Sequence, residues 1–113
     1  MHEMSLAEGV LQLIEDAARR DGFNKVSTVW LEIGQLSSVE PDAMLFCFDA
    51  VTRGTVADGA RLEILTVPGQ GWCEACASTV PMTELFGECP HCGACPLEVT
   101  AGTEMRVKEL EVS

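Results

Sequence analysis

The sequence is short of basic residues, and this shortage limits the partners that it can have. Only 7 of its 113 residues are Lys or Arg, whereas 18 are Asp or Glu, so the formal net charge at pH 7 is −11. A chain of this charge repels a phosphate backbone, which argues against a nucleic-acid partner. Cations and basic protein surfaces are the better candidates.

The sequence also lacks a long apolar run. Charged residues or glycines interrupt every hydrophobic stretch before it reaches the roughly 18 residues that a membrane span needs, so no membrane partner is expected. The first residues have neither the basic start nor the apolar stretch of a signal peptide, which favours a cytoplasmic location. The length leaves room for one modest core or for a small core and a satellite, and it excludes a large enzyme.

Hydrophobic periodicity predicts a small α/β base domain of two helices and a three-stranded sheet. Ser5 and Glu8 fit a capping box at the start of the first helix. The apolar stripe of the second helix is predicted as Met44, Leu45, Phe48 and Val51. The expected elements are a helix over residues 4–20, a strand over 26–34, a helix from Pro41 to Gly54, a strand over 61–67 and a strand from Met105 to Val112.

Five of the six cysteines fall in one segment, where regular periodicity disappears. This change predicts an inserted zinc-ribbon-like module over residues 69–100, so that the base domain comprises residues 1–68 and 101–113. In a reducing compartment these cysteines are better candidates for metal ligands or buried thiols than for disulfides.

Two CxxC pairs carry the strongest signal in the sequence. Two residues between paired cysteines let both thiolates point at one ion, and two such turns complete a tetrahedron around zinc. A closed structural Zn²⁺ site is therefore expected, and metal binding would replace the core that so short a module lacks. Iron, redox chemistry and disulfides are the alternatives. The predicted zinc ligands are Cys73, Cys76, Cys89 and Cys92.

Three further residues near these motifs receive ordinary interpretations. Cys95 is expected to be a bystander, although it could compete as an alternative ligand or act as a redox-sensitive thiol. His91 lies inside the second pair, and its ring is expected to project to solvent or to groups around the site. Cys47 lies among apolar residues and is expected to be a small buried hydrophobe.

The N-terminus offers a second type of metal site. A histidine at position 2 can combine the amine of Met1, its own amide nitrogen and its imidazole around one ion, and the amide of Glu3 can complete a planar set of four nitrogens. This geometry suits Ni(II) or Cu(II) better than Zn(II). An isolated terminal histidine is usually without function, so this reading depends on its position. His2 is expected to precede the first helix.

Several co-occurring motifs resemble the HypA/HybF family of hydrogenase maturation proteins, and the resemblance runs from residue 1 to the last predicted strand. The chain has histidine-free exits from both CxxC pairs, at Ala77 and Gly93, where some relatives carry histidine, so histidine exchange at the metal is not expected here. The motifs are Met1-His2-Glu3-Met4-Ser5-Leu6-Ala7, Val29-Trp30-Leu31-Glu32-Ile33-Gly34, Phe48-Asp49, Thr52-Arg53-Gly54-Thr55 and the paired CxxC sequences.

The resemblance implies a nickel metallochaperone, which is not an enzyme. His2 would anchor Ni²⁺ as transported cargo, Glu3 would support it, and the four paired cysteines would hold structural Zn²⁺. The implied partners are the GTPase HypB and the large subunit of [NiFe] hydrogenase, with the chain as a monomer or a homodimer.

Two other classes of function compete with this one. A zinc-ribbon module for protein interaction or a transcription accessory would have only incidental nickel binding and would survive removal of His2. An enzyme that uses its cysteines as redox or nucleophilic groups would need an acid/base pair, and none is apparent from the spacing.

Overall fold

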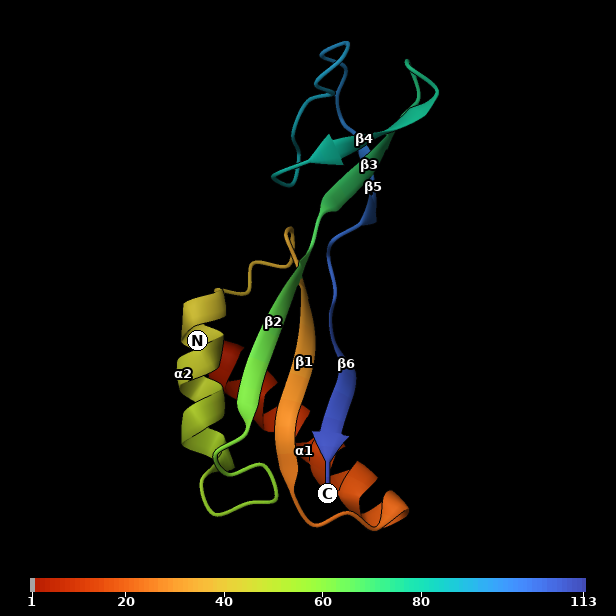
Figure 1. Cartoon of the computed structure of the whole chain (residues 1–113). Coiled ribbons are helices and arrows are strands. Elements are labelled where there is room, and N and C mark those ends of the chain that lie inside the picture. Colours follow the sequence, from red (N-terminus) through yellow and green to blue (C-terminus); the bar gives the residue numbers. More distant parts are fainter. Residues whose placement is uncertain (1) are drawn as a thin grey trace. The chain divides into compact units, whose positions relative to one another are not determined.

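The computed structural model describes residues 2–113 (Figure 1), so the predicted role of Met1 lies outside the described residues. Its two helices and two three-stranded sheets confirm the expected mixed α/β class with an additional small module. One sheet has the strand order β2-β1-β6 and the other β4-β3-β5. The elements are α1 (His2–Asp21), β1 (Val26–Gly34), α2 (Pro41–Thr52), β2 (Arg61–Val67), β3 (Gly69–Cys73), β4 (Ser78–Met82), β5 (Glu98–Ala101) and β6 (Met105–Val112).

The chain divides into two compact units. Unit 1 contains the described part of Met1–Leu31 together with Val39–Ile64 and Val107–Ser113, and unit 2 contains Glu32–Ser38 and Leu65–Arg106. The boundaries predicted from the sequence, at residues 68 and 101, stay a prediction. No helix among the described residues is both long and apolar enough to cross a bilayer.

The core of unit 1 forms between its helices and the central strand. Helices α1 and α2 contact each other, and β1 buries Val29 and Leu31 on the face that its alternation predicts. The buried apolar residues include Ala7, Val10, Ile14, Val26, Val29, Leu31, Met44, Cys47 and Phe48.

The predicted start of the first helix is wrong. Helix α1 begins at His2, so Ser5 and Glu8 lie inside it and form no capping box, and His2 does not precede it. The error has a physical cause: Glu3 is acidic in the first turn, where it favours the helix dipole, and its buried carboxylate accepts a hydrogen bond from the backbone N–H of Glu40. Neither feature produces hydrophobic periodicity.

The buried stripe of α2 differs from the predicted one at two positions, because neither Leu45 nor Val51 is buried. Leu45 is 41% exposed, whereas Cys47 and Thr52 are buried beside Met44 and Phe48. Residues 44, 47, 48 and 52 repeat at helical spacing, and Leu45 lies about 100° around the helix from Met44. The start of α2 is set by Glu40, whose carboxylate accepts from the N–H of Asp42 at 3.1 Å.

Unit 2 contains three short strands that the sequence pattern does not reveal. Strand β3 pairs with β4 and with β5, and both pairs are antiparallel. The inward positions of β3 are Gly69, Gly71 and Cys73, so glycine hides the alternation. Gly71 faces Val80 in the register, and a Cβ there would collide with the sulfur of Met82. The core of unit 2 consists of Leu36, Cys73, Val80, Met82, Cys89 and Leu97.

Three glycines from separate segments meet inside unit 2. A Cβ on Gly34 would collide with the carbonyl of Gly102, and one on Gly102 would lie 2.6 Å from the Cα of Gly69. Gly102 also has φ +93°, a conformation that L side chains disfavour. We call Gly34, Gly69 and Gly102 the glycine junction.

Candidate metal centres

The four cysteines of the CxxC pairs lie together in unit 2. Their Sγ atoms all lie within 4.8 Å of one another. The Sγ atoms of Cys73 and Cys92 are 3.6 Å apart, and those of Cys76 and Cys89 are 3.8 Å apart. A tetrahedron with metal–sulfur bonds of about 2.3 Å has edges of about 3.8 Å. The thiols therefore have the spacing of a four-cysteine metal site.

Each CxxC pair forms a tight turn that directs backbone N–H groups at sulfur. The N–H of Cys76 donates to Cys73 Sγ, and the N–H of His91 donates to Cys89 Sγ, both at 3.4 Å. The chain leaves the first turn at Ala77 with φ 51° and the second at Gly93 with φ 74°. Both exits are left-handed, a conformation that glycine adopts readily and alanine does not.

We expect opposite effects from exchanging the residues at these exits. Gly93→Ala places a Cβ in open space, so its effect is the left-handed backbone alone, about 1 kcal/mol. Ala77→Gly removes the same strain. Because metal binding and folding of unit 2 are coupled, metal affinity should fall about fivefold in Gly93→Ala and rise by a similar factor in Ala77→Gly. Competition against a chromophoric chelator measures both changes.

A matched control is Gly54→Ala, which has φ 77° and open space in unit 1. It should lower the stability of unit 1 and leave metal affinity unchanged. Equal metal affinity in Gly93→Ala and the unmodified chain would contradict the role assigned to this exit.

Cys89 and Cys76 differ in acidity. Burial opposes ionisation of Cys89, but the backbone N–H groups of Cys92 and His91 outweigh it and lower the pKa of Cys89 to about 6. Hydrogen bonding with Cys92, followed by burial, raises the pKa of Cys76 to about 12. At neutral pH the metal-free cluster therefore holds Cys89 as a thiolate and Cys76 as a thiol. A cation must displace protons before all four sulfurs can bind it.

The neighbouring residues take the places that the sequence predicts. Cys47 is buried in α2 at 1% exposure. His91 is exposed. Cys95 is an exposed free cysteine, and among the described residues it stands outside the group of four thiols.

The start of α1 brings His2 and Glu3 together. The exposed imidazole of His2 places Nε2 3.5 Å from Oε2 of Glu3, whose side chain is 9% exposed. The same oxygen accepts from the backbone N–H of Glu40 at 3.3 Å. No local pattern points to Glu40, because it lies 37 positions from Glu3 and only the fold brings the two together.

The environment of Glu3 keeps its carboxylate charged. The backbone N–H of Glu40, then that of Glu3 itself, hold the pKa of the Glu3 carboxyl below its ordinary value against the opposing effect of burial, and the charge of His2 adds to this effect. The carboxylate thus remains an acceptor beside the imidazole at neutral pH.

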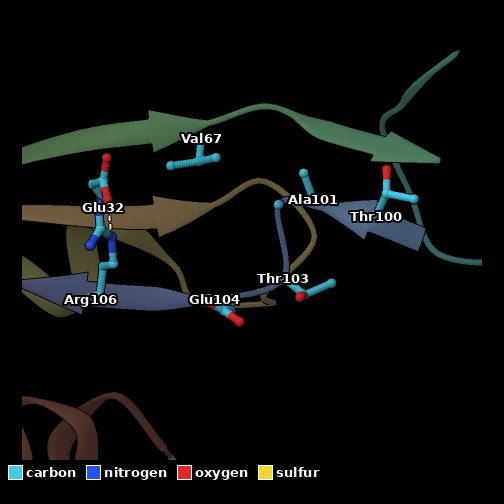
Figure 2. Close-up of a pocket in the computed structure, with 8 residues that line it drawn as sticks. Glu32, Val67, Thr100, Ala101, Thr103, Glu104 and Arg106 are labelled. Carbon is cyan, nitrogen blue, oxygen red and sulfur yellow. Dashed lines mark hydrogen bonds and ion pairs between the residues drawn. The ribbon is translucent and has the colours of Figure 1, made fainter. Parts of the chain in front are cut away.

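A separate pocket lies along the strands of unit 2 and contains no cysteine or histidine (Figure 2). Its volume is about 260 Å³. Glu32 and Arg106 form an ion pair at one end of its lining, with Nε and Oε1 2.5 Å apart. Because this pair satisfies the charges of both side chains, the pocket offers no free metal-binding group from them.

Comparisons with known proteins agree with this geometry. Residues 1–112 match the family described as "Hydrogenase/urease nickel incorporation, metallochaperone, hypA". The chain is 78% identical to the hydrogenase maturation factor HypA of Albidiferax ferrireducens and 66% identical to that of Dechloromonas aromatica, with 99% of each chain covered in both cases. The solution structure of the Ni metallochaperone HypA from Helicobacter pylori is 26% identical and has a TM-score of 0.72 over 99% of this chain and 97% of that one.

The family description and the likeness to this solved structure place the chain, with its four-cysteine cluster, in the class of metallochaperones. The chain belongs to the HypA family of nickel metallochaperones for hydrogenase maturation.

Proposed function

We propose that this protein binds Ni²⁺ at its N-terminus and delivers it to the large subunit of [NiFe] hydrogenase. The observation that carries the proposal is the placement of His2 and Glu3 at the first turn of α1, with the Glu3 carboxylate buried and charged beside an exposed imidazole. Membership of the HypA family supports it. The protein acts as a carrier without catalytic turnover, and the cytoplasm is its proposed location.

The nickel ligands proposed are the amine of Met1, the amide nitrogen and imidazole of His2, and the amide nitrogen of Glu3. The first four N–H groups of a helix have no intrahelical acceptor, so a helix that begins at His2 commits neither amide to a backbone carbonyl. Deprotonation of the Glu3 amide would end its hydrogen bond to the Glu3 carboxylate. Chelation by successive backbone nitrogens needs ψ near zero, and helical ψ is about −42°. Nickel binding should therefore flatten the first residues of α1 without disturbing the rest of the helix.

The four cysteines would hold Zn²⁺ in a structural role. Thiolates suit Zn²⁺, and the two sulfur–sulfur distances match a tetrahedron around it. Four protein ligands leave no open position for a substrate or for exchange of nickel. We assign Cys73, Cys76, Cys89 and Cys92 to zinc and residues 69–100 to an inserted zinc-binding domain, with residues 1–68 and 101–113 as the nickel-binding base domain.

Delivery requires partners, for which we propose the GTPase HypB and the hydrogenase large subunit. Nickel must pass between ligands a few Å apart, so the handover contact belongs near the N-terminus. Affinity for nickel should be moderate, on the order of micromolar or about −8 kcal/mol, because each tenfold increase adds about 1.4 kcal/mol that the acceptor must overcome.

Metal analysis followed by nickel titration tests the proposal. The purified chain with a free N-terminus should contain one zinc per monomer and bind one further nickel, and it should restore nickel insertion in cells that lack their own HypA. Zinc without any nickel site would instead favour a zinc-ribbon interaction module.

A further inference from the structure

The loop over residues 83–88 presents the most exposed aromatic side chain among the described residues. It connects β4 to Cys89. Phe86 is 88% exposed, and the neighbouring Leu85 is 44% exposed. The core of unit 2 is small and contains no aromatic residue. Phe86 lies in solvent and adds nothing to that core. Packing within unit 2 does not explain its presence.

Phe86 is also held in an unfavourable backbone conformation. Its φ is 63°, and the only other described non-glycine residues with positive φ are Ser38 and Ala77. A bulky residue rarely adopts this conformation, and such strain concentrates at functional sites. Glycine would fit the turn better, as it does at Gly93 in the second CxxC exit. The turn therefore keeps an exposed phenylalanine where glycine is the conformationally easier residue.

The loop is fixed at both ends. Met82, the last residue of β4, pairs with Gly69 and is 3% exposed. Cys89, one of the four clustered cysteines, follows the loop directly and is also 3% exposed. A metal ion bound to Cys89 would hold the second end, so metal binding would present Phe86 in a defined position.

A hollow of about 210 Å³ is lined by residues that precede and follow Phe86 in this loop, although Phe86 itself does not line it. Its lining includes the carboxylate residues Glu84 and Glu88, with Pro81, Met82 and Pro90 contributing apolar surface. Within the described part of the chain neither carboxylate takes part in an ion pair. Apolar walls with two free carboxylates suit the stem and charged head of a Lys or Arg side chain.

The charge of the surrounding sequence points in the same direction. No Lys or Arg occurs between Arg61 and Arg106, whereas that interval contains six glutamates. An anionic membrane surface and a nucleic acid would be repelled. A second copy of the chain, with its net charge of −11, is also disfavoured.

We propose that Phe86 and the hollow lined by its own loop form a docking site for a basic protein surface. Phe86 enters an apolar pocket of that partner, and a Lys or Arg at the rim of the pocket enters the hollow lined by Glu84 and Glu88. This site lies in unit 2 and is additional to the nickel handover at the N-terminus. Only the choice of probes rests on the proposed function.

Binding measurements with the zinc-loaded full chain test the proposal, with purified HypB and the purified hydrogenase large-subunit precursor as probes. Phe86→Gly suits the backbone at φ 63° and removes only the side chain. It should weaken binding to at least one probe about tenfold or more, as expected for a buried aromatic anchor. The double variant Glu84→Gln/Glu88→Gln should reduce the salt dependence of that binding.

Leu13→Ser, at a 60% exposed position in α1, is the matched control and should bind as the unmodified chain does. Zinc content and nickel titration of every variant separate docking from folding and from nickel carriage. Unchanged affinity of Phe86→Gly for both probes would overturn the proposal. Failure of the unmodified chain to bind either probe would also overturn it, and nickel titration would still decide the proposed function. Dissociation of a homodimer by Phe86→Gly would assign the surface to a second copy instead.

Discussion

Replacing Cys89 by serine is expected to remove the bound metal and unfold β3, β4 and β5, while unit 1 keeps its helices. Cys89 is 3% exposed, belongs to the core of unit 2 and accepts the N–H of His91. Structural zinc contributes roughly 10 to 16 kcal/mol to folding at neutral pH, far more than a core of this size. Zinc content by elemental analysis and residue-resolved amide NMR spectra measure the two effects.

Cys95→Ser is the control for this substitution, since Cys95 is exposed and outside the cluster. It should retain full zinc and an unchanged spectrum. Full zinc in Cys89→Ser, followed by its loss in Cys89→Ser/Cys95→Ser, would show that Cys95 can enter the site.

The pH dependence of metal affinity is a second property of the cluster that can be measured. Cys76 has a pKa of about 12, so metal binding must expel its proton. Metal affinity should therefore fall about tenfold for each unit fall in pH and for each proton expelled.

Replacing His2 by alanine should abolish nickel binding while zinc content and helicity stay unchanged. The His2 side chain is 55% exposed and alanine is a good residue for a first helical turn, so the substitution disturbs little packing. Loss of the imidazole and of its chelate ring should reduce nickel affinity more than about a hundredfold from a micromolar value. Calorimetric titration at one pH, with the absorbance of planar Ni(II), measures the change.

Adding one residue before Met1 should be almost as damaging, because it moves the terminal amine out of its chelate ring and leaves His2 in place. A site built from side chains alone would tolerate the extension. His91→Ala is the control, since His91 is exposed and serves the cysteine cluster only through its backbone N–H. Unmodified binding in the extended chain would rule out ligation by the amine. Unmodified binding in His2→Ala would remove the nickel assignment altogether.

Sequence reasoning succeeded where a local pattern carries the information. The bounds of β1 and β2 agree with the predicted strands at 26–34 and 61–67, because alternation and flanking glycines or prolines mark both. The meeting of the four cysteines is also confirmed, since the spacing within each CxxC pair nearly determines its turn.

The sequence failed where the information is not local or not hydrophobic. Strand β3 buries Gly69 and Gly71. Glycine adds nothing to an apolar alternation, so the sheet of unit 2 was not predicted. The hydrogen bond between Glu40 and Glu3 joins the starts of two helices. Neither residue type predicts that the other is its partner. The sequence does not predict the exposure of Phe86 either. An aromatic residue between glutamates is as compatible with burial as with exposure.

The glycine junction determines how this protein can be cut and recombined. Chimeras that exchanged residues 69–100 alone would separate Gly69 from Gly102, which lies too close to it to carry a side chain and which also lies against Gly34. All three glycines belong to unit 2, as do residues 32–38. The segments taken from a relative should therefore be joined near residues 31, 38, 64 and 106. All three glycines then come from the same protein, so their backbones keep their native contacts with one another.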